Sequence, residues 1–301
     1  MISLVLAIAA SVVLETDVPA TMRDGVVLRA DILRPDAPGL FPAIVLRTPY
    51  GKADEWRDSF AIRAARAGYV VVAQDVRGRY ASDGVYHPYH QEGKDGYDTV
   101  EWAASLPYVN GKVGMAGLSY PGAVQWLAAM EKPPHLATIT PLMCFSNARH
   151  FFFTGGAWDL SWISWFYLNI APDARARVGL PGPKTDVEAQ ELWEKHREEW
   201  LRFLPLSELP VLRNTAPAYY EWLAHPEDGP YWDFAKSKRA TARSRSRRST
   251  SPAGTTRVTV PPGPFATTGA RARTRAASSS VPGGAGRRGS IASVKENSIS
   301  G

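Results

Sequence analysis

The stretch that most constrains the fold is residues 111–130, GKVGMAGLSYPGAVQWLAAM. Residues 113–118 are apolar and interrupted by glycine, which is typical of a short strand buried inside a parallel sheet. The residues from Ala123 onward favour a helix, with Pro121 in its first turn. The sequence therefore predicts a strand, a tight turn and a helix, with Ser119 at the apex of the turn.

Gly117 and Gly122 flank this serine, and neither has a Cβ atom to collide when the backbone reverses direction sharply. A serine in such a turn is lifted above the sheet at the N-terminus of the next helix, an arrangement known as a nucleophile elbow. Gly122 follows Ser119 by three residues instead of the usual two, so the motif alone also fits a plain turn. The neighbouring stretches decide between these two interpretations.

Strand and helix patterns alternate over the first half of the chain. The predicted order is a strand at 41–50, a helix around 57–67, a strand at 69–76, a helix around 97–105, the elbow strand, and a strand at 135–143. This alternation predicts an α/β fold, a parallel sheet with helices on both faces. Catalytic groups in such a sheet lie after the carboxyl ends of strands, where Tyr50 and Ser119 both fall. Residues 22–35 alternate around an Asp24-Gly25 turn, which predicts antiparallel strands at an edge.

Two further segments are LRTPYGK at 46–52 and YVVVAQDVRGRYASDG at 69–84. In that order with GLSYPGAVQW at 117–126, they resemble the CocE/NonD hydrolases, which include acyl esterases and Xaa-Pro dipeptidyl-peptidases and whose own elbow is Gly-x-Ser-Tyr-x-Gly. The resemblance covers about residues 15–235. It implies an α/β-hydrolase core and a serine hydrolase that cleaves an ester or amide through an acyl-enzyme, with no metal or organic cofactor.

The resemblance also implies an oxyanion hole beside the nucleophile Ser119, formed by the backbone N–H of Tyr120 and the hydroxyl of Tyr50. The role of Ser119 follows from the elbow as well. A phenolic O–H can donate to the oxyanion of a tetrahedral intermediate, and a preorganised donor of this kind typically contributes about 3–4 kcal/mol. The alternative for Tyr50 is a packed aromatic at a strand end. Asp75 and Arg77 are interpreted as groups that brace the loop beside the site.

Three segments are predicted: a hydrolase core at 1–150, a helical cap at 151–235 and a tail at 236–301. The second segment is rich in tryptophan and shows helical patterns without alternating strands. The resemblance implies that it covers the active site and that its aromatic face lines the acyl pocket. For any single aromatic residue, packing inside the cap is the alternative.

The tail contains 14 Lys and Arg residues and one acidic residue, Glu296, so its net charge is +13. Since the whole chain carries a net charge of +6, residues 1–235 carry −7. It has no hydrophobic periodicity and too little apolar surface to offset the entropy of ordering, which predicts disorder. We favour the interpretation that it is a GC-rich gene translated out of frame. The alternative is a non-enzymatic binding protein whose arginines contact the phosphates of nucleic acid.

A serine becomes nucleophilic when a histidine takes its proton and a carboxylate orients that histidine. In this fold both groups follow the serine in the chain, yet past Asp233 there is neither Asp nor His. The six histidines are interpreted as solvated or hydrogen-bonded, and His87 with His90 lacks the further ligands of a metal site. We therefore expect the 301-residue chain to be inactive and to expose a sheet edge.

The expected substrate is a small-molecule ester, amide or peptide, with neither nucleic acid nor a membrane as a partner. The oligomeric state does not follow from the sequence. Residues 1–19 contain an apolar run but lack a basic segment, so we favour a first strand or a misassigned start over a signal peptide, and hence a cytoplasmic location. Cys144, the single cysteine, is expected to be a small packed group.

Overall fold

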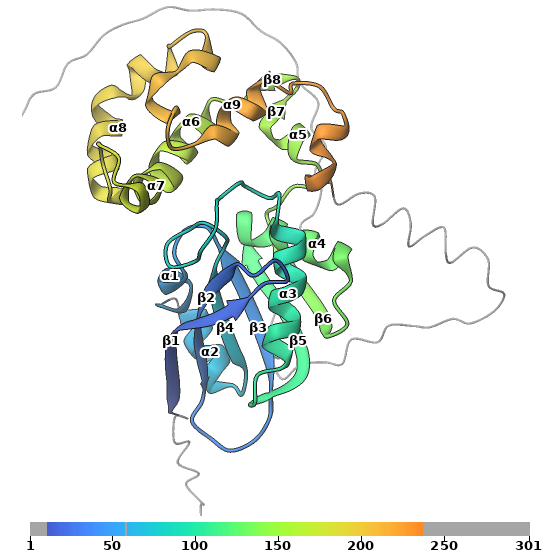
Figure 1. Ribbon diagram of the computed structural model, residues 1–301. Coiled ribbons are helices and arrows are strands. Elements are labelled where there is room, and N and C mark those ends of the chain that lie inside the picture. Colours follow the sequence, from blue (N-terminus) through green and yellow to red (C-terminus); the bar gives the residue numbers. More distant parts are fainter. Residues whose placement is uncertain (1–10, 58, 237–301) are drawn as a thin grey trace, which may run out of the picture. The chain divides into compact units, whose positions relative to one another are not determined.

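The computed structural model describes residues 11–57 and 59–236 of the chain (Figure 1). Its centre is a six-stranded sheet with the strand order β1-β2-β4-β3-β5-β6. The strands are β1 (Val12–Thr21), β2 (Val27–Pro35), β3 (Phe41–Thr48), β4 (Val70–Asp75), β5 (Val109–Leu118) and β6 (Leu136–Leu142). Strands β3 to β6 are parallel and β1 and β2 form an antiparallel edge, which confirms the predicted sheet.

Helices cover both faces of this sheet, as predicted. The triplet Val70-Val71-Val72 in β4 is fully buried. Successive strand side chains point to opposite faces, so both faces of the sheet are covered at this strand. Val70 and Val72 belong to a cluster that contains residues of α3 (Glu92–Ala104) and α4 (Tyr120–Glu131). Val71 packs in a second cluster with residues of α2 (Ser59–Arg66), which α1 (Lys52–Arg57) precedes. A strand buried on both faces reads as a continuous apolar run, as this one does.

Several predicted boundaries differ from the observed ones. The N-terminal hairpin turns at Asp24-Gly25 as predicted, but its first strand is β1, which lies entirely before residue 22. Helix α3 begins at Glu92, five residues before the predicted start. The elbow strand begins at Val109, and the helix after Ser119 begins at once. Strand β6 lies where it was predicted.

From Ala148 onward the described chain is almost entirely helical. Its elements are α5 (Ala148–Phe152), α6 (Ser161–Trp165), a π-helical turn η1 (Phe166–Ile170), α7 (Ala171–Val178), α8 (Asp186–Leu201), the 3-10 turns η2 (Leu206–Glu208) and η3 (Pro210–Leu212), α9 (Pro217–Leu223) and η4 (Pro230–Ala235). The expectation that this segment lacks strands was wrong in one detail, because β7 (Phe153–Thr154) pairs with β8 (Ala157–Trp158). We call residues 148–235 the cap.

Aromatic side chains form the core of the cap. Six of them are almost fully buried: Phe152, Phe166, Tyr167, Tyr219, Trp222 and Trp232. Packing inside the cap is therefore the role of these six. The same cluster includes Tyr120, Val124 and Leu127 of α4, so the cap core continues onto the elbow helix. The described residues accordingly fall within one compact unit, and the predicted division at residue 150 stays a prediction.

The expectations for the tail and for a membrane-spanning helix can be compared only with the residues that the structure describes. The predicted disorder of the tail concerns residues that, apart from Lys236, lie outside the described part, as do residues 1–10. Across residues 11–57 and 59–236, no helix has the combination of length and apolar character needed to cross a membrane.

The contact between α3 and α4 gives the first testable prediction. A Cβ atom added at Gly96 of α3 would lie 2.6 Å from the Cβ of Ala128 in α4. We expect Gly96→Ala to lower the free energy of unfolding by about 1–3 kcal/mol, the usual cost of overpacking a core. In an Ala128→Gly background the same substitution should cost much less, because the 2.6 Å clash is gone, a 3.3 Å contact with the Cα of residue 128 remains, and alanine favours the helix. Urea unfolding of the four proteins measures both effects, and an equal effect in both backgrounds would contradict this packing.

Candidate active site

The backbone at Ser119 has the conformation of a nucleophile elbow. Its φ is 65° and its ψ is −118°, a region that residues with a side chain rarely adopt. A Cβ atom at Gly117 would lie 2.4 Å from Pro121 Cβ, and one at Gly122 would lie 2.5 Å from Leu142 O. Both glycines are therefore required by close backbone approach, as predicted. The N–H of Ser119 donates to Leu142 O at 3.0 Å, which ties the apex to the end of β6.

Tyr120 follows Ser119 as the first residue of α4, where a backbone N–H has no acceptor inside the helix. Its side chain is 1% exposed, and its hydroxyl donates to Glu92 Oε1 at 2.7 Å and accepts from Tyr89 N at 3.1 Å. The side chain of Tyr120 is thus fixed beneath the elbow. Its N–H remains as a donor beside Ser119 at the positive end of the helix dipole.

Glu92 belongs to a buried ion pair that the sequence did not predict. Its Oε2 lies 2.6 Å from Arg47 NH1, and both side chains are at most 5% exposed. Burial raises the pKa of Glu92, and the positive charge of Arg47 opposes that change. Arg47 Nε also donates to Gln74 Oε1 at 2.9 Å. Strands β3 and β4 and helix α3 therefore meet at one charged group directly under Tyr120.

Tyr50 lies two residues after β3, on the loop beside Ser119. Its hydroxyl oxygen accepts a hydrogen bond from Trp165 Nε1 of the cap at 3.0 Å. Burial raises the pKa of this hydroxyl, and interactions with Trp165, Arg79 and the Ser119 side chain oppose the rise. The phenol is therefore neutral near pH 7, and it keeps its own proton for donation because Trp165 supplies the hydrogen bond to its oxygen.

Asp75 and Lys52 hold the other side of the Tyr50 loop. The N–H of Lys52 donates to Asp75 Oδ1 at 2.7 Å, and Lys52 Nζ lies 3.6 Å from Asp75 Oδ2. The same ammonium lies 2.7 Å from Asp17 and 3.5 Å from Asp31. Burial raises the pKa of Asp75 to about 6, since Lys52 divides its charge among three carboxylates and offsets the burial only in part. Asp75 thus braces this loop, as predicted.

The two arginines after β4 have different roles. Arg77 pairs with Asp95 at 2.6 Å and with Asp24 at 2.9 Å, which braces its loop against α3 and the N-terminal hairpin, as predicted. Arg79 is 1% exposed and donates through Nε to Pro49 O at 2.9 Å. Its two terminal nitrogens donate to carbonyl groups of the cap. Sequence analysis missed Arg79, because nothing in the order Arg-Gly-Arg tells which arginine points inward.

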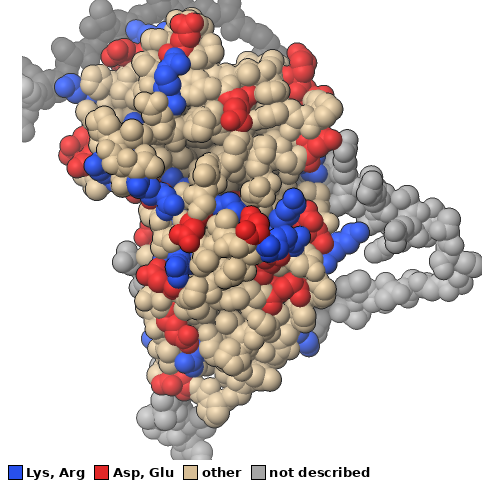
Figure 2. All heavy atoms as spheres, in the orientation of Figure 1, with Lys and Arg blue, Asp and Glu red and all other residues tan. Residues whose placement is uncertain are grey.

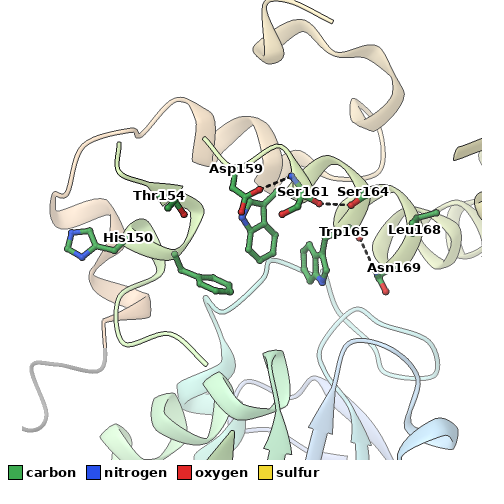
Figure 3. Close-up of a pocket in the computed structure, with 10 residues that line it drawn as sticks. His150, Thr154, Asp159, Ser161, Ser164, Trp165, Leu168 and Asn169 are labelled. Carbon is green, nitrogen blue, oxygen red and sulfur yellow. Dashed lines mark hydrogen bonds between the residues drawn. The ribbon is translucent and has the colours of Figure 1, made fainter. Parts of the chain in front are cut away.

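A cavity of about 450 Å³ lies in the cap (Figure 3). Its wall is mixed, with the rings of Phe151, Trp162 and Trp165 beside polar groups such as Asp159 and Asn169. Figure 3 shows Asp159 Oδ1 turned toward the N–H of Ser161, which donates to it at 2.9 Å. Trp165 joins the cavity to the elbow region, because the same indole contacts the Tyr50 hydroxyl.

The histidines all have other partners in the described structure. The ring contacts and ion pairs are His87 with Glu221, His90 with Phe234, His135 with Glu101, His150 with Asp228, His196 with Trp200 and His225 with Tyr231. Burial lowers the pKa of His90 to about 4, so this ring is neutral near pH 7. Among the described residues, no histidine forms a hydrogen bond with Ser119.

The charged groups of the described chain do not gather into a metal site. Within residues 11–57 and 59–236, no group of three or more His, Cys, Asp or Glu side chains is arranged to hold a metal ion. Figure 2 shows acidic and basic side chains interspersed over the visible face. The structure thus brings Ser119, Tyr50 and Tyr120 together and adds three groups that the sequence did not single out: Trp165, Arg79 and Glu92.

The raised pKa of Asp75 predicts a specific pH dependence. Since the folded chain binds this proton more tightly than the unfolded chain, Asp75 contributes stability that is full below its unfolded pKa of 3.8 and is lost as the pH rises through about 6. Asp75→Asn stays neutral, so the parent should lose about 3 kcal/mol of unfolding free energy relative to this variant between pH 3.5 and 7. Urea unfolding across that range gives the difference. If the difference in unfolding free energy between the two proteins does not change with pH, Lys52 fully offsets the effect of burial on the pKa of Asp75.

Comparisons with known proteins show the family and the fold of this chain. Residues 24–250 match the family described as X-Pro dipeptidyl-peptidase (S15 family). Cocaine esterase from Rhodococcus sp. (strain MB1 Bresler) is 39% identical over 136 residues, which are 44% of this chain and 24% of that protein. The chain thus spans about a quarter of the length of this relative.

Two solved structures show the same fold. An aminopeptidase from a marine sediment Thaumarchaeota archaeon superposes with a TM-score of 0.56 at 20% identity, covering 78% of this chain and 41% of that one. A CocE/NonD family hydrolase from Staphylococcus aureus superposes with a TM-score of 0.53 at 24% identity, covering 75% and 38%. The predicted α/β-hydrolase fold and the resemblance to CocE/NonD hydrolases are confirmed. With the family matched over residues 24–250, the chain belongs to the X-Pro dipeptidyl-peptidase (S15) family.

Proposed function

We propose that this chain carries the nucleophile and the oxyanion hole of a serine hydrolase that cleaves an ester or amide bond. The observation that carries the proposal is the elbow itself, with Ser119 at φ 65° between the N-terminus of α4 and the hydroxyl of Tyr50. Strained backbone of this kind persists only where the surrounding structure enforces it, and it concentrates at catalytic sites. The family membership supports a hydrolase of the esterase or peptidase type.

In the proposed reaction, Ser119 Oγ attacks the carbonyl carbon of the substrate, its hydroxyl proton passes to water, and the carbonyl oxygen becomes an oxyanion. The Tyr50 O–H and the Tyr120 N–H donate hydrogen bonds to that oxygen. The intermediate then expels the alcohol or amine, which takes a proton from water unless it leaves as a stable anion, and an acyl group remains on Ser119 until water hydrolyses it in a second step. Both donors are held before substrate arrives, Tyr50 by Trp165 and Tyr120 by Glu92, so little reorganisation is needed.

The cap cavity is the proposed acyl pocket. Its volume of about 450 Å³ suits a small ester, amide or short peptide, and its aromatic walls favour an apolar acyl group. Trp165 connects this cavity to Tyr50, so an acyl group in the cavity would approach the oxyanion hole from the cap side.

The proposed active site lacks a general base and the acid that would orient it. The six histidines are engaged elsewhere, and the acid and base that serine hydrolases of this fold place after the nucleophile have no counterpart beyond Asp233 in the sequence. Loss of the catalytic histidine alone typically costs about a millionfold in turnover. We therefore propose that the 301-residue polypeptide is essentially inactive as a catalyst, while Ser119 still accepts an activated acyl group.

The role of Tyr50 predicts a change in acylation rate. Tyr50→Phe removes the donor and keeps the ring, so transfer of butyryl from p-nitrophenyl butyrate to Ser119 should slow about 10²–10³-fold, as expected for one oxyanion donor. Mass spectrometry of the protein at timed intervals measures the acylation. Tyr108→Phe is the matched control, because that hydroxyl contacts Glu15 far from the elbow. An unchanged rate in Tyr50→Phe would make Tyr50 a packed aromatic only.

The missing base predicts the outcome of a turnover assay. We expect steady-state hydrolysis of p-nitrophenyl butyrate by the 301-residue chain to equal that of its Ser119→Ala variant. Release of p-nitrophenol is followed over many equivalents of substrate. Turnover that depends on Ser119 would contradict this expectation, and single His→Gln variants would then identify the histidine that acts as base.

A further inference from the structure

We propose that Arg79 is a positioning residue that fixes the Tyr50 loop and the cap in one geometry, so that the oxyanion donor and the acyl pocket are set together. The inference rests on the proposed role of Tyr50 as an oxyanion donor. It concerns a residue that contacts neither substrate nor Ser119 in the proposed reaction.

The contacts of one guanidinium carry the argument. Arg79 Nε donates to Pro49 O at 2.9 Å, and Pro49 directly precedes Tyr50. NH1 donates to Ile170 O at 2.8 Å and NH2 donates to Asn169 O at 2.6 Å, both in the cap. NH1 also lies 3.2 Å from a carboxylate oxygen of Asp173. With the side chain 1% exposed, water does not compete for these donors.

The cap presents these acceptors where two of its helical segments meet. The π-helical turn η1 ends at Ile170, and α7 begins with Ala171. A carbonyl oxygen has two lone pairs, so Asn169 O and Ile170 O can each accept from the guanidinium of Arg79 in addition to a helical donor. Asp173, in the first turn of α7, balances the charge of Arg79. Arg79 thus ties this junction of the cap to the Tyr50 loop.

The same part of the cap makes a second contact with the Tyr50 loop, through Trp165. Trp165 and Asn169 both line the cap cavity, and Asn169 Nδ2 donates to Trp165 O at 3.1 Å (Figure 3). Trp165 contacts the Tyr50 hydroxyl, while Asn169 contacts Arg79 through its carbonyl. The loop is thus held from its backbone by Arg79 and from its side chain by Trp165. Burial raises the pKa of Tyr50, and the positive charge of Arg79 opposes that rise.

The test measures the Trp165–Tyr50 hydrogen bond directly in the 301-residue chain. Proton–nitrogen NMR spectra resolve the indole N–H groups of the ten tryptophans, and Trp165→Phe assigns the signal of Trp165. In Arg79→Met we expect hydrogen exchange at the Trp165 indole to accelerate about tenfold, because the loop and the cap are no longer tied. The indoles of Trp102 and Trp126, on α3 and α4, should keep their rates.

Arg77→Met is the matched control. It removes an arginine from the same loop together with its ion pairs to Asp95 and Asp24, but none of the contacts to Pro49 or the cap. We expect its Trp165 exchange rate to stay within about twofold of the parent, whatever its thermal stability. If Arg79→Met does not fold, Arg79→Lys keeps the charge but cannot span both carbonyl groups, and it should give an intermediate acceleration.

Two results would overturn the proposal. One is a folded Arg79 variant with parental exchange at Trp165, and the other is an equal acceleration at every indole, which would mean general destabilisation. Acylation of Ser119 by p-nitrophenyl butyrate separates this inference from the proposed function. If Ser119 accepts no acyl group in the parent while indole exchange at Trp165 accelerates in Arg79→Met, the proposed function is wrong but Arg79 does link the Tyr50 loop to the cap. If Ser119 is acylated at the same rate in the parent and in Arg79→Met, the proposed function is supported and the positioning role of Arg79 is wrong.

Discussion

The strained backbone at Ser119 is the constraint on which the rest of the structure depends. A non-glycine residue at φ 65° is held there only if its surroundings prevent relaxation. Gly117 and Gly122 permit the reversal, since any Cβ atom at either position would overlap neighbouring atoms. The buried hydroxyl of Tyr120, bound to Glu92, prevents the start of α4 from rotating away. The elbow is therefore enforced from the strand, the helix and the ion pair beneath.

Charged groups, more than apolar ones, hold the loops at the carboxyl edge of the sheet. Arg47 joins strands β3 and β4 to α3, Lys52 gathers three aspartates, and Arg79 reaches the cap. Breaking a buried ion pair leaves an uncompensated charge, so each of these groups resists displacement of its loop. The apolar clusters fix the layers of the fold, while these cations fix the loops that carry Tyr50 and the turn after β4. Precise placement of an oxyanion donor requires that second kind of constraint.

The sequence predicted what depends on local pattern. The parallel strands, the elbow and the carboxyl-edge positions of Tyr50 and Ser119 all follow from runs of apolar residues broken by glycine and proline, and the structure agrees. The start of α3 was missed because Gly93 and Gly96 lower the helix propensity of its first turns. Gly96 is there because Ala128 leaves no room for a Cβ atom, which only the packed helices reveal. The roles of Arg79 and Trp165 were missed for the same reason, since their partners lie about 90 and 115 residues away in the chain.

The central claim is that the fold holds Ser119 at a strained elbow beside an oxyanion hole, so that it accepts activated acyl and phosphoryl groups although no general base among the described residues contacts it. The most direct test treats the native 301-residue chain with a fluorophosphonate probe and maps the adduct by peptide mass spectrometry. The account predicts an adduct on Ser119 and on no other serine, absent from the Ser119→Ala variant and from the urea-unfolded chain. A native chain whose Ser119 is unmodified, or is modified no faster than the serines of the unfolded chain, would contradict it.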